Sequence, residues 1–169
     1  MACLFLAPAL LLASPGLAAN DSILLPDVSM RMLDGLETSL QAATQGHPSL
    51  LVLSFQRNQR ADMESWMVVD EETCGRHPTL RRISLALLPS GIRLLRRVID
   101  PAIAESVGAE HGCGRTATAY LDKRPLLQSL AVQSEDEVLI ILLSGNGTEL
   151  WRGSGAATPE SVRALESHL

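Results

Sequence analysis

Residues 49–66 read SLLVLSFQRNQRADMESW and join an apolar run to a polar turn and a helical pattern. Residues 50–55 are apolar except for Ser54, which is typical of a central strand that is buried on both faces. Met63, Trp66 and Met67 then recur at helical spacing. The segment therefore predicts a buried strand that passes directly into a helix.

Upstream of this segment, residues 25–40 (LPDVSMRMLDGLETSL) predict a β-hairpin. Apolar and polar residues alternate from Val28 to Met32, as they do along a half-buried strand. Asp34-Gly35 is a strong signal for the turn of a hairpin.

Downstream, the pattern predicts alternating strands and helices. The expected elements are a strand at 82–88, helical spacing at 92–103 with a kink or break at Pro101, a glycine-rich loop at 108–117, a short helix at 124–132, strands at 138–143 and 148–152, and a final helix from Thr158. This order predicts an α/β domain with a central mixed sheet, flanking helices and an N-terminal β-hairpin.

Three segments together resemble the thioredoxin-like superfamily: residues 25–40, residues 53–66, and residues 138–165 (VLIILLSGNGTELWRGSGAATPESVRAL). The last segment also looks like the C-terminal signature of the ATP synthase assembly factor 10 family and its bacterial relatives. The resemblance implies a chaperone-like protein that binds and assists another protein during assembly of a membrane complex. Contact with a proton-channel subunit is the implied form of that assistance.

The cysteines that this resemblance leads us to expect are missing. Thioredoxins carry a CxxC motif whose first cysteine lies five residues after the closing Phe of the strand. The residues five and eight positions after Phe55 are Arg60 and Met63. Thioredoxins also place a cis-proline before the next core strand, where residues 133–137 contain no proline. We therefore expect no catalytic residues, no cofactor and no enzymatic activity.

Two groups of residues are candidates for binding a partner. Gln56, Arg57, Gln59 and Arg60 occupy the turn after the first core strand, where they form either a recognition surface or a solvated loop. Later in the chain, Trp151 and Arg152 stand beside Gly153 and Gly155. If the glycines leave that side of the strand open, Trp151 and Arg152 line a partner surface, and otherwise they pack under the final helix.

Cys74 and Cys113 support an alternative hypothesis. In an oxidising compartment this pair favours a structural disulfide. It is also the basis of an alternative function as a thiol–disulfide protein or a copper or zinc protein, since Cys74 and Cys113 are close in sequence to His77 and His111. We expect no metal site, because the turn where copper chaperones of this fold carry their cysteines has none.

The N-terminal residues 4–19 (LFLAPALLLASPGLAA) resemble the apolar region of a signal peptide. We expect residues 1–19 to be a signal peptide and residues 20–169 to be a single thioredoxin-like domain that is exported to the periplasm. No later apolar run approaches the ~20 residues of a membrane span. The net charge of −5 argues against nucleic acid as a partner. The partner that the resemblance implies is another protein, a subunit of a membrane complex.

Overall fold

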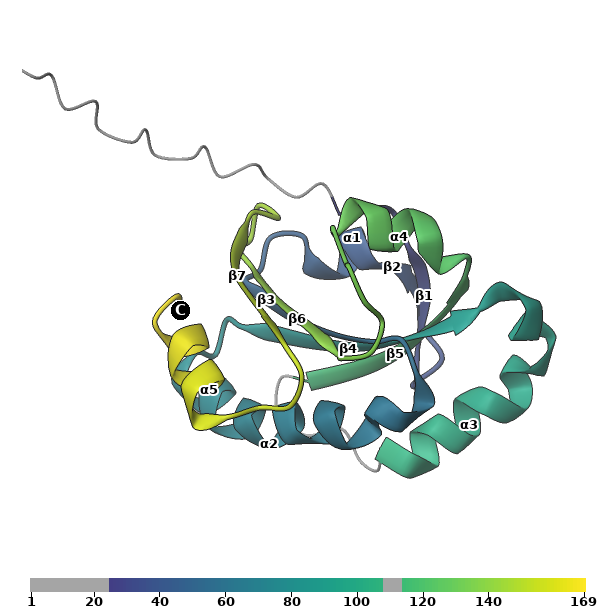
Figure 1. The fold of residues 1–169 in the computed structure, drawn as a ribbon, viewed down its shortest axis with the longest axis horizontal. Coiled ribbons are helices and arrows are strands. Elements are labelled where there is room, and N and C mark those ends of the chain that lie inside the picture. The colour runs from purple at the N-terminus through teal and green to yellow at the C-terminus, as the bar shows by residue number, and fades with distance from the viewer. Residues whose placement is uncertain (1–24, 108–113) are drawn as a thin grey trace, which may run out of the picture.

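The computed structural model describes residues 25–107 and 114–169, which form a seven-stranded mixed sheet with helices on both faces (Figure 1). The strands are β1 (Ser29–Met32), β2 (Glu37–Ser39), β3 (Ser49–Ser54), β4 (Arg81–Pro89), β5 (Gly114–Leu121), β6 (Leu139–Leu143) and β7 (Glu149–Ser154). Their order across the sheet is β2-β1-β5-β4-β3-β6-β7. The neighbours β3, β4 and β5 are parallel, and the outer pairings are antiparallel. The predicted mixed sheet is confirmed.

The helices are α1 (Leu40–Thr44), α2 (Arg60–Arg76), α3 (Arg96–Val107), α4 (Lys123–Ser129) and α5 (Pro159–Glu166), with 3-10 turns η1 (Arg57–Gln59) and η2 (Ser90–Leu95). In Figure 1, α1 and α4 lie on one face of the sheet, and α2 and α5 lie on the other. Among the described residues, no helix is long and apolar enough to cross a membrane. The expected signal peptide, residues 1–19, lies outside the described residues.

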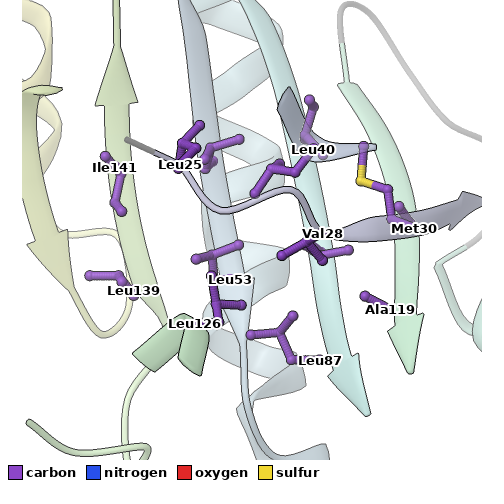
Figure 2. Close-up of a cluster of buried hydrophobic side chains, with 14 of the residues drawn as sticks. Leu25, Val28, Met30, Leu40, Leu53, Leu87, Ala119, Leu126, Leu139 and Ile141 are labelled. Carbon is purple, nitrogen blue, oxygen red and sulfur yellow. The ribbon is translucent and has the colours of Figure 1, made fainter. Parts of the chain in front are cut away.

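Strand β3 lies at the centre of two hydrophobic cores. Leu51 and Leu53 belong to the core under α1 and α4, whereas Leu50 and Val52 belong to the core under α2 and α5. Figure 2 shows part of the first core, where side chains of the sheet gather around the segment that leads from Leu25 into β1. Because successive side chains of a strand point to opposite faces, the continuous apolar run fills both cores, as predicted.

The N-terminal hairpin is also present. Strands β1 and β2 pair in antiparallel register, with Arg31 opposite Glu37. Gly35 in the turn has a φ of 95°, a conformation that glycine adopts without steric cost. The short helix α1 follows directly on β2 and was not predicted.

The glycine-rich loop predicted at residues 108–117 is wrong in its second part, because β5 begins at Gly114. Residues 108–113 lie outside the described residues. β5 pairs with β4 along eight positions, from Arg82 opposite Gly114 to Pro89 opposite Leu121. Its sequence GRTATAYL has no apolar run. Non-local pairing therefore makes this segment a strand, since local hydrophobicity does not.

The helical spacing predicted at residues 92–103 is divided between two elements. The 3-10 turn η2 covers its first part, and α3 begins at Arg96 and continues through Pro101. The predicted helix at 124–132 corresponds to α4, whose N-cap Asp122 accepts a hydrogen bond from the Arg124 amide. The Thr158 N-cap of α5 is present as predicted.

Candidate functional site

The junction between β3 and α2 has the register that the sequence predicts. After Phe55, the chain makes the turn η1 and enters α2 at Arg60. Arg60 is thus the first residue of the helix, and Met63 lies one turn further on. Met63 is half-buried and packs against the core that contains Trp66. Neither position offers a thiol.

Gln59 closes the turn from inside the protein. Its side chain is 2% exposed. The Oε1 atom accepts hydrogen bonds from the backbone amides of Phe55 at 2.7 Å and Gln56 at 3.1 Å. The Nε2 atom donates to the carbonyl of Glu135 at 2.7 Å. Gln59 therefore ties the turn to a loop 76 residues later in the chain.

The loop at residues 133–137 is held to the same junction by two further side chains. Gln56 Nε2 donates to the Glu135 carbonyl at 3.0 Å. Lys123 donates to the Phe55 carbonyl at 3.2 Å and forms an ion pair with the Glu135 carboxylate. We call Phe55, Gln56, Gln59, Lys123 and Glu135 the junction network. The network holds the loop at residues 133–137, which is where thioredoxins carry their cis-proline. The described residues contain no cis peptide bond.

The two arginines of the turn face outward. Arg57 is exposed, and the Arg60 side chain is 59% exposed. Arg60 Nε donates to Glu64 Oε1 at 2.6 Å, an ion pair across one helical turn. The predicted binding group thus divides into Gln59, which is buried, Gln56, which is exposed but bonded to Glu135, and the two outward-facing arginines.

Trp151 and Arg152 lie on opposite sides of β7. The Trp151 ring packs against Trp66, with ring centroids 6.1 Å apart and planes inclined at 54°. It also covers Gly153, where an added Cβ would lie 2.5 Å from the indole. Of the two alternatives for Trp151, the structure shows packing: the indole occupies the space above Gly153 and lies against the core that contains Leu165 of α5.

Arg152 makes its contacts on the other face of the sheet. It donates to both carboxylate oxygens of Glu149, at 2.9 and 2.8 Å, and to the carbonyl of Leu130 at 2.6 Å. The hydrogen bonds that Arg152 donates to Glu149 raise the pKa of Arg152, which keeps its charge throughout. Arg152 also lines a cavity of about 430 Å³ with Ser134 and Glu137. The loop at 133–137 thus lies between the junction network and Arg152.

Cys74 lies in the last turn of α2 and is disulfide-bonded. It is the only cysteine in the described residues, so its partner lies outside them. The pairing with Cys113 stays a prediction. Within residues 25–107 and 114–169, no three His, Cys, Asp or Glu side chains are grouped so as to hold a metal ion. His111 and Cys113 of the alternative metal hypothesis are not among these residues.

No protein-family model matches the sequence, and no curated protein matches it. Solved structures do match along most of the chain. A proposed electron transfer protein from Aquifex aeolicus VF5 superposes with a TM-score of 0.61 at 15% identity, covering 85% of this chain and 91% of its own. BsSco, a member of the Sco family of cytochrome c oxidase assembly proteins, gives a TM-score of 0.57 at 15% identity, with 85% and 92% covered.

A secreted disulfide oxidoreductase from Mycobacterium tuberculosis gives a TM-score of 0.53 at 10% identity, covering 89% of this chain and 100% of its own. Thiol–disulfide proteins recur among the other matches. The protein has a thioredoxin-like fold. At these identities the likeness extends to the fold alone. The resemblance to the ATP synthase assembly factor 10 family stays a prediction.

The sequence predicted the β3–α2 junction but not the junction network that closes it. The buried run ending at Phe55 identifies the strand, and its distance to Arg60 identifies the helix start. Lys123 and Glu135 were not predicted as members of the site. No local pattern marks them. Besides each other, their partners are Phe55, Gln56 and Gln59 in the turn after β3, at least 68 positions away in the sequence.

Proposed function

We propose that this protein binds and assists another protein without thiol chemistry, during assembly of a membrane complex such as ATP synthase. The observation that carries the proposal is the pair Arg60 and Met63 at the start of α2. Thiol–disulfide exchange needs a thiolate as nucleophile. A guanidinium and a thioether do not supply one, so this end of the fold is suited to holding a partner.

The comparison with BsSco supports an assembly role on this scaffold. That protein belongs to a family of assembly proteins for cytochrome c oxidase, and its fold superposes on most of this chain. The predicted resemblance to the ATP synthase assembly factor 10 family points in the same direction. Export to the periplasm is part of the proposal, supported by the apolar residues 4–19 and by the secreted protein among the matched structures.

The partner surface that we propose is the basic rim of the junction network. Arg57 and Arg60 extend from the turn. Arg124 follows the network residue Lys123, is 83% exposed and is paired with Asp122. Guanidinium groups bind carboxylates through paired hydrogen bonds. The rim therefore fits an acidic segment of another protein. Trp151 and Arg152 stay proposed contacts as well, each on its own face of β7, with Arg152 on the far side of the 133–137 loop.

Site-specific photo-crosslinking in cells tests this surface. A photo-reactive residue at position 57 should capture one partner, and Arg60→Ala should reduce that capture. The matched control is position 163 on α5, an exposed arginine whose Nε donates to a carbonyl of its own helix. Equal capture at both positions, or capture that is unchanged by Arg60→Ala, contradicts the proposal. A reactive group at position 151 tests the contact at Trp151 in the same way.

A second candidate function is thiol–disulfide or metal chemistry at Cys74 and Cys113. The described activities of the matched structures favour this candidate, because several are thiol–disulfide proteins. The disulfide at Cys74 is a specific observation in its favour. In this mechanism, a partner's thiolate would attack one sulfur of the bridge, and the other sulfur would leave as a thiolate.

An insulin-reduction assay separates the two candidates. The non-catalytic proposal predicts no turnover by the wild-type protein. Turnover that is lost in Cys113→Ser and in Cys74→Ser establishes the second candidate instead. Thiol titration under denaturing conditions shows whether both cysteines are bridged. Metal analysis of untagged protein shows whether copper or zinc accompanies them.

A further inference from the structure

A ridge of apolar and basic side chains stands on the surface at the junction of β4 and α3. Leu94 is 94% exposed, Leu95 is 56% exposed and Val98 is 71% exposed. Arg93 and Arg97 lie beside them and are also exposed. We call these five residues the η2–α3 ridge. Large apolar side chains gathered in this way on a surface mark an interaction site.

Helical spacing places the members of the ridge side by side. Leu94 and Val98 are four residues apart, as are Arg93 and Arg97, so each pair stacks along the segment. Asp100 is two residues after Val98, on the opposite side of α3 from that side chain, and attaches the helix to the sheet. Its Oδ1 atom accepts hydrogen bonds from Thr118 at 3.1 Å and Tyr120 at 2.7 Å. The ridge therefore points away from the protein.

The charges of the ridge specify the kind of partner. Within the described residues, Arg93 and Arg97 form no ion pair, although the whole chain has a net charge of −5. Cations beside exposed leucines are typical of segments that lie in the surface of an anionic membrane, with the apolar side chains among the acyl chains. We propose that the η2–α3 ridge anchors this protein to an anionic lipid surface.

Two observations favour lipid over other occupants. A contact between two copies through the ridge would place Arg93 and Arg97 of both copies in one interface, and the ridge has no carboxylate to pair with them. A peptide partner binds in a groove. At the ridge, by contrast, η2 has no buried residue, and α3 lies at the outer edge of the molecule (Figure 1).

The anchor goes beyond the proposed function and does not depend on it. Strands β3 and β4 are parallel, so their carboxyl ends lie at the same edge of the sheet. The junction network follows β3, and the ridge follows β4. A protein held by the ridge would present the basic rim, with Arg57 and Arg60, close to the membrane surface.

Vesicle flotation of the purified full chain tests the anchor. We expect binding to vesicles of phosphatidylglycerol and phosphatidylcholine, and much weaker binding to phosphatidylcholine alone. Replacing both leucines, Leu94→Ser with Leu95→Ser, should weaken binding at least about tenfold. Replacing both arginines, Arg93→Gln with Arg97→Gln, should cost about fivefold for each residue at low salt. Because residues 1–24 contain no lysine or arginine, the dependence on anionic lipid distinguishes the ridge from that apolar segment.

Matched variants control for general effects on the surface. Val68 on α2 is 74% exposed, and Arg163 on α5 is exposed, so Val68→Ser and Arg163→Gln remove the same chemistry elsewhere. Both should bind as the wild type does, and circular dichroism should show every variant folded.

The proposal is overturned if the ridge variants bind like the wild type or if neutral vesicles bind equally well. It is also overturned if the leucine variant instead abolishes a dimer in sedimentation equilibrium, or if only an acidic protein binds the ridge. Loss of partner crosslinking with vesicle binding intact would affect the proposed function and leave the anchor standing.

Discussion

The β3–α2 and β4–α3 junctions are two places where a parallel strand passes into a helix, and they use side chains in opposite ways. At the first, the polar Gln59 is 2% exposed and holds the turn closed through three hydrogen bonds. At the second, Leu94 is 94% exposed and touches the solvent. A polar residue thus stabilises the interior of one junction, while an apolar residue is left outside at the other.

The difference shows what each junction contributes. A buried amide is tolerated only when its donors and acceptors are paired, and Gln59 meets that condition. An exposed leucine gains nothing for the fold, so its position is free to serve an interaction. We expect stability to depend on the first junction and surface binding to depend on the second.

Gln59→Leu should have the largest effect on stability. The substitution leaves the buried Phe55 amide without its acceptor and removes the bond to the Glu135 carbonyl, at a cost of about 3 kcal/mol in the free energy of unfolding. Urea denaturation measures the change. Gln56→Leu is the matched control, with a smaller expected loss because Gln56 is exposed and its amide makes one bond to Glu135. If Gln59→Leu has the same free energy of unfolding as the wild type, the contrast between the two junctions is contradicted.

Lys123→Met should destabilise the same junction by a smaller amount, about 1 to 2 kcal/mol. The change removes the hydrogen bond to the Phe55 carbonyl and leaves the Glu135 carboxylate without its cation. Both side chains are partly exposed, so water replaces part of the loss. Thermal unfolding followed by circular dichroism measures it. Arg124→Met, one residue later and exposed, should be close to neutral, and an equal loss in both variants would argue against the network.

Tyr120 gives the β4–α3 junction a dependence on alkaline pH. Burial and the hydrogen bond to Asp100 raise the pKa of the Tyr120 phenol well above its usual value. The unfolded chain therefore releases this proton near pH 10, while the folded chain retains it. The free energy of unfolding should fall as the pH rises above about 10, and less steeply in Tyr120→Phe. Because Tyr120 is the only tyrosine, tyrosinate absorbance follows it directly, and an ordinary titration midpoint in the folded protein would contradict this contact.

The smallest effect on stability should come from the ridge. Leu94→Ser combined with Leu95→Ser should change the free energy of unfolding by no more than about 0.5 kcal/mol, because exposed side chains lose little packing when they are replaced. Urea denaturation provides the measurement. A loss comparable to that of Gln59→Leu would show that the leucines are packed, and the contrast between the two junctions would fail.

The local sequence pattern was sufficient to predict an element where residues adjacent in the chain determine its structure. The apolar run of β3 predicts a strand that is buried on both faces, and Asp34-Gly35 predicts the hairpin turn, and both are confirmed. Strand β5 was missed because Thr116 and Thr118 carry no apolar signal. Both are buried, and their positions are set by pairing with β4, which lies well upstream in the sequence.

In the candidate site, too, some features are predictable from the sequence and others depend on contacts between distant residues. The sequence predicts which residues form the turn and that Arg60 and Met63 replace thiols, because the distance from Phe55 is a property of the chain itself. It does not distinguish Gln59 from Gln56, two identical side chains three positions apart. In the folded protein both donate to the Glu135 carbonyl, but only Gln59 is buried and accepts from the amides of Phe55 and Gln56.

The amino-acid order alone therefore establishes the strand–helix register, the hairpin and the absence of a CxxC motif at the junction, since each depends on residues adjacent in the chain. Tertiary structure decides which side chains are inside. It buries Gln59 and pairs its amide with the distant Glu135 carbonyl at 2.7 Å, and it places the Trp151 indole over Gly153. It leaves Leu94 exposed because α3 is held to the sheet through Asp100, on its opposite side. Burial depends on which surfaces meet, and that information arises only when the whole sheet is assembled.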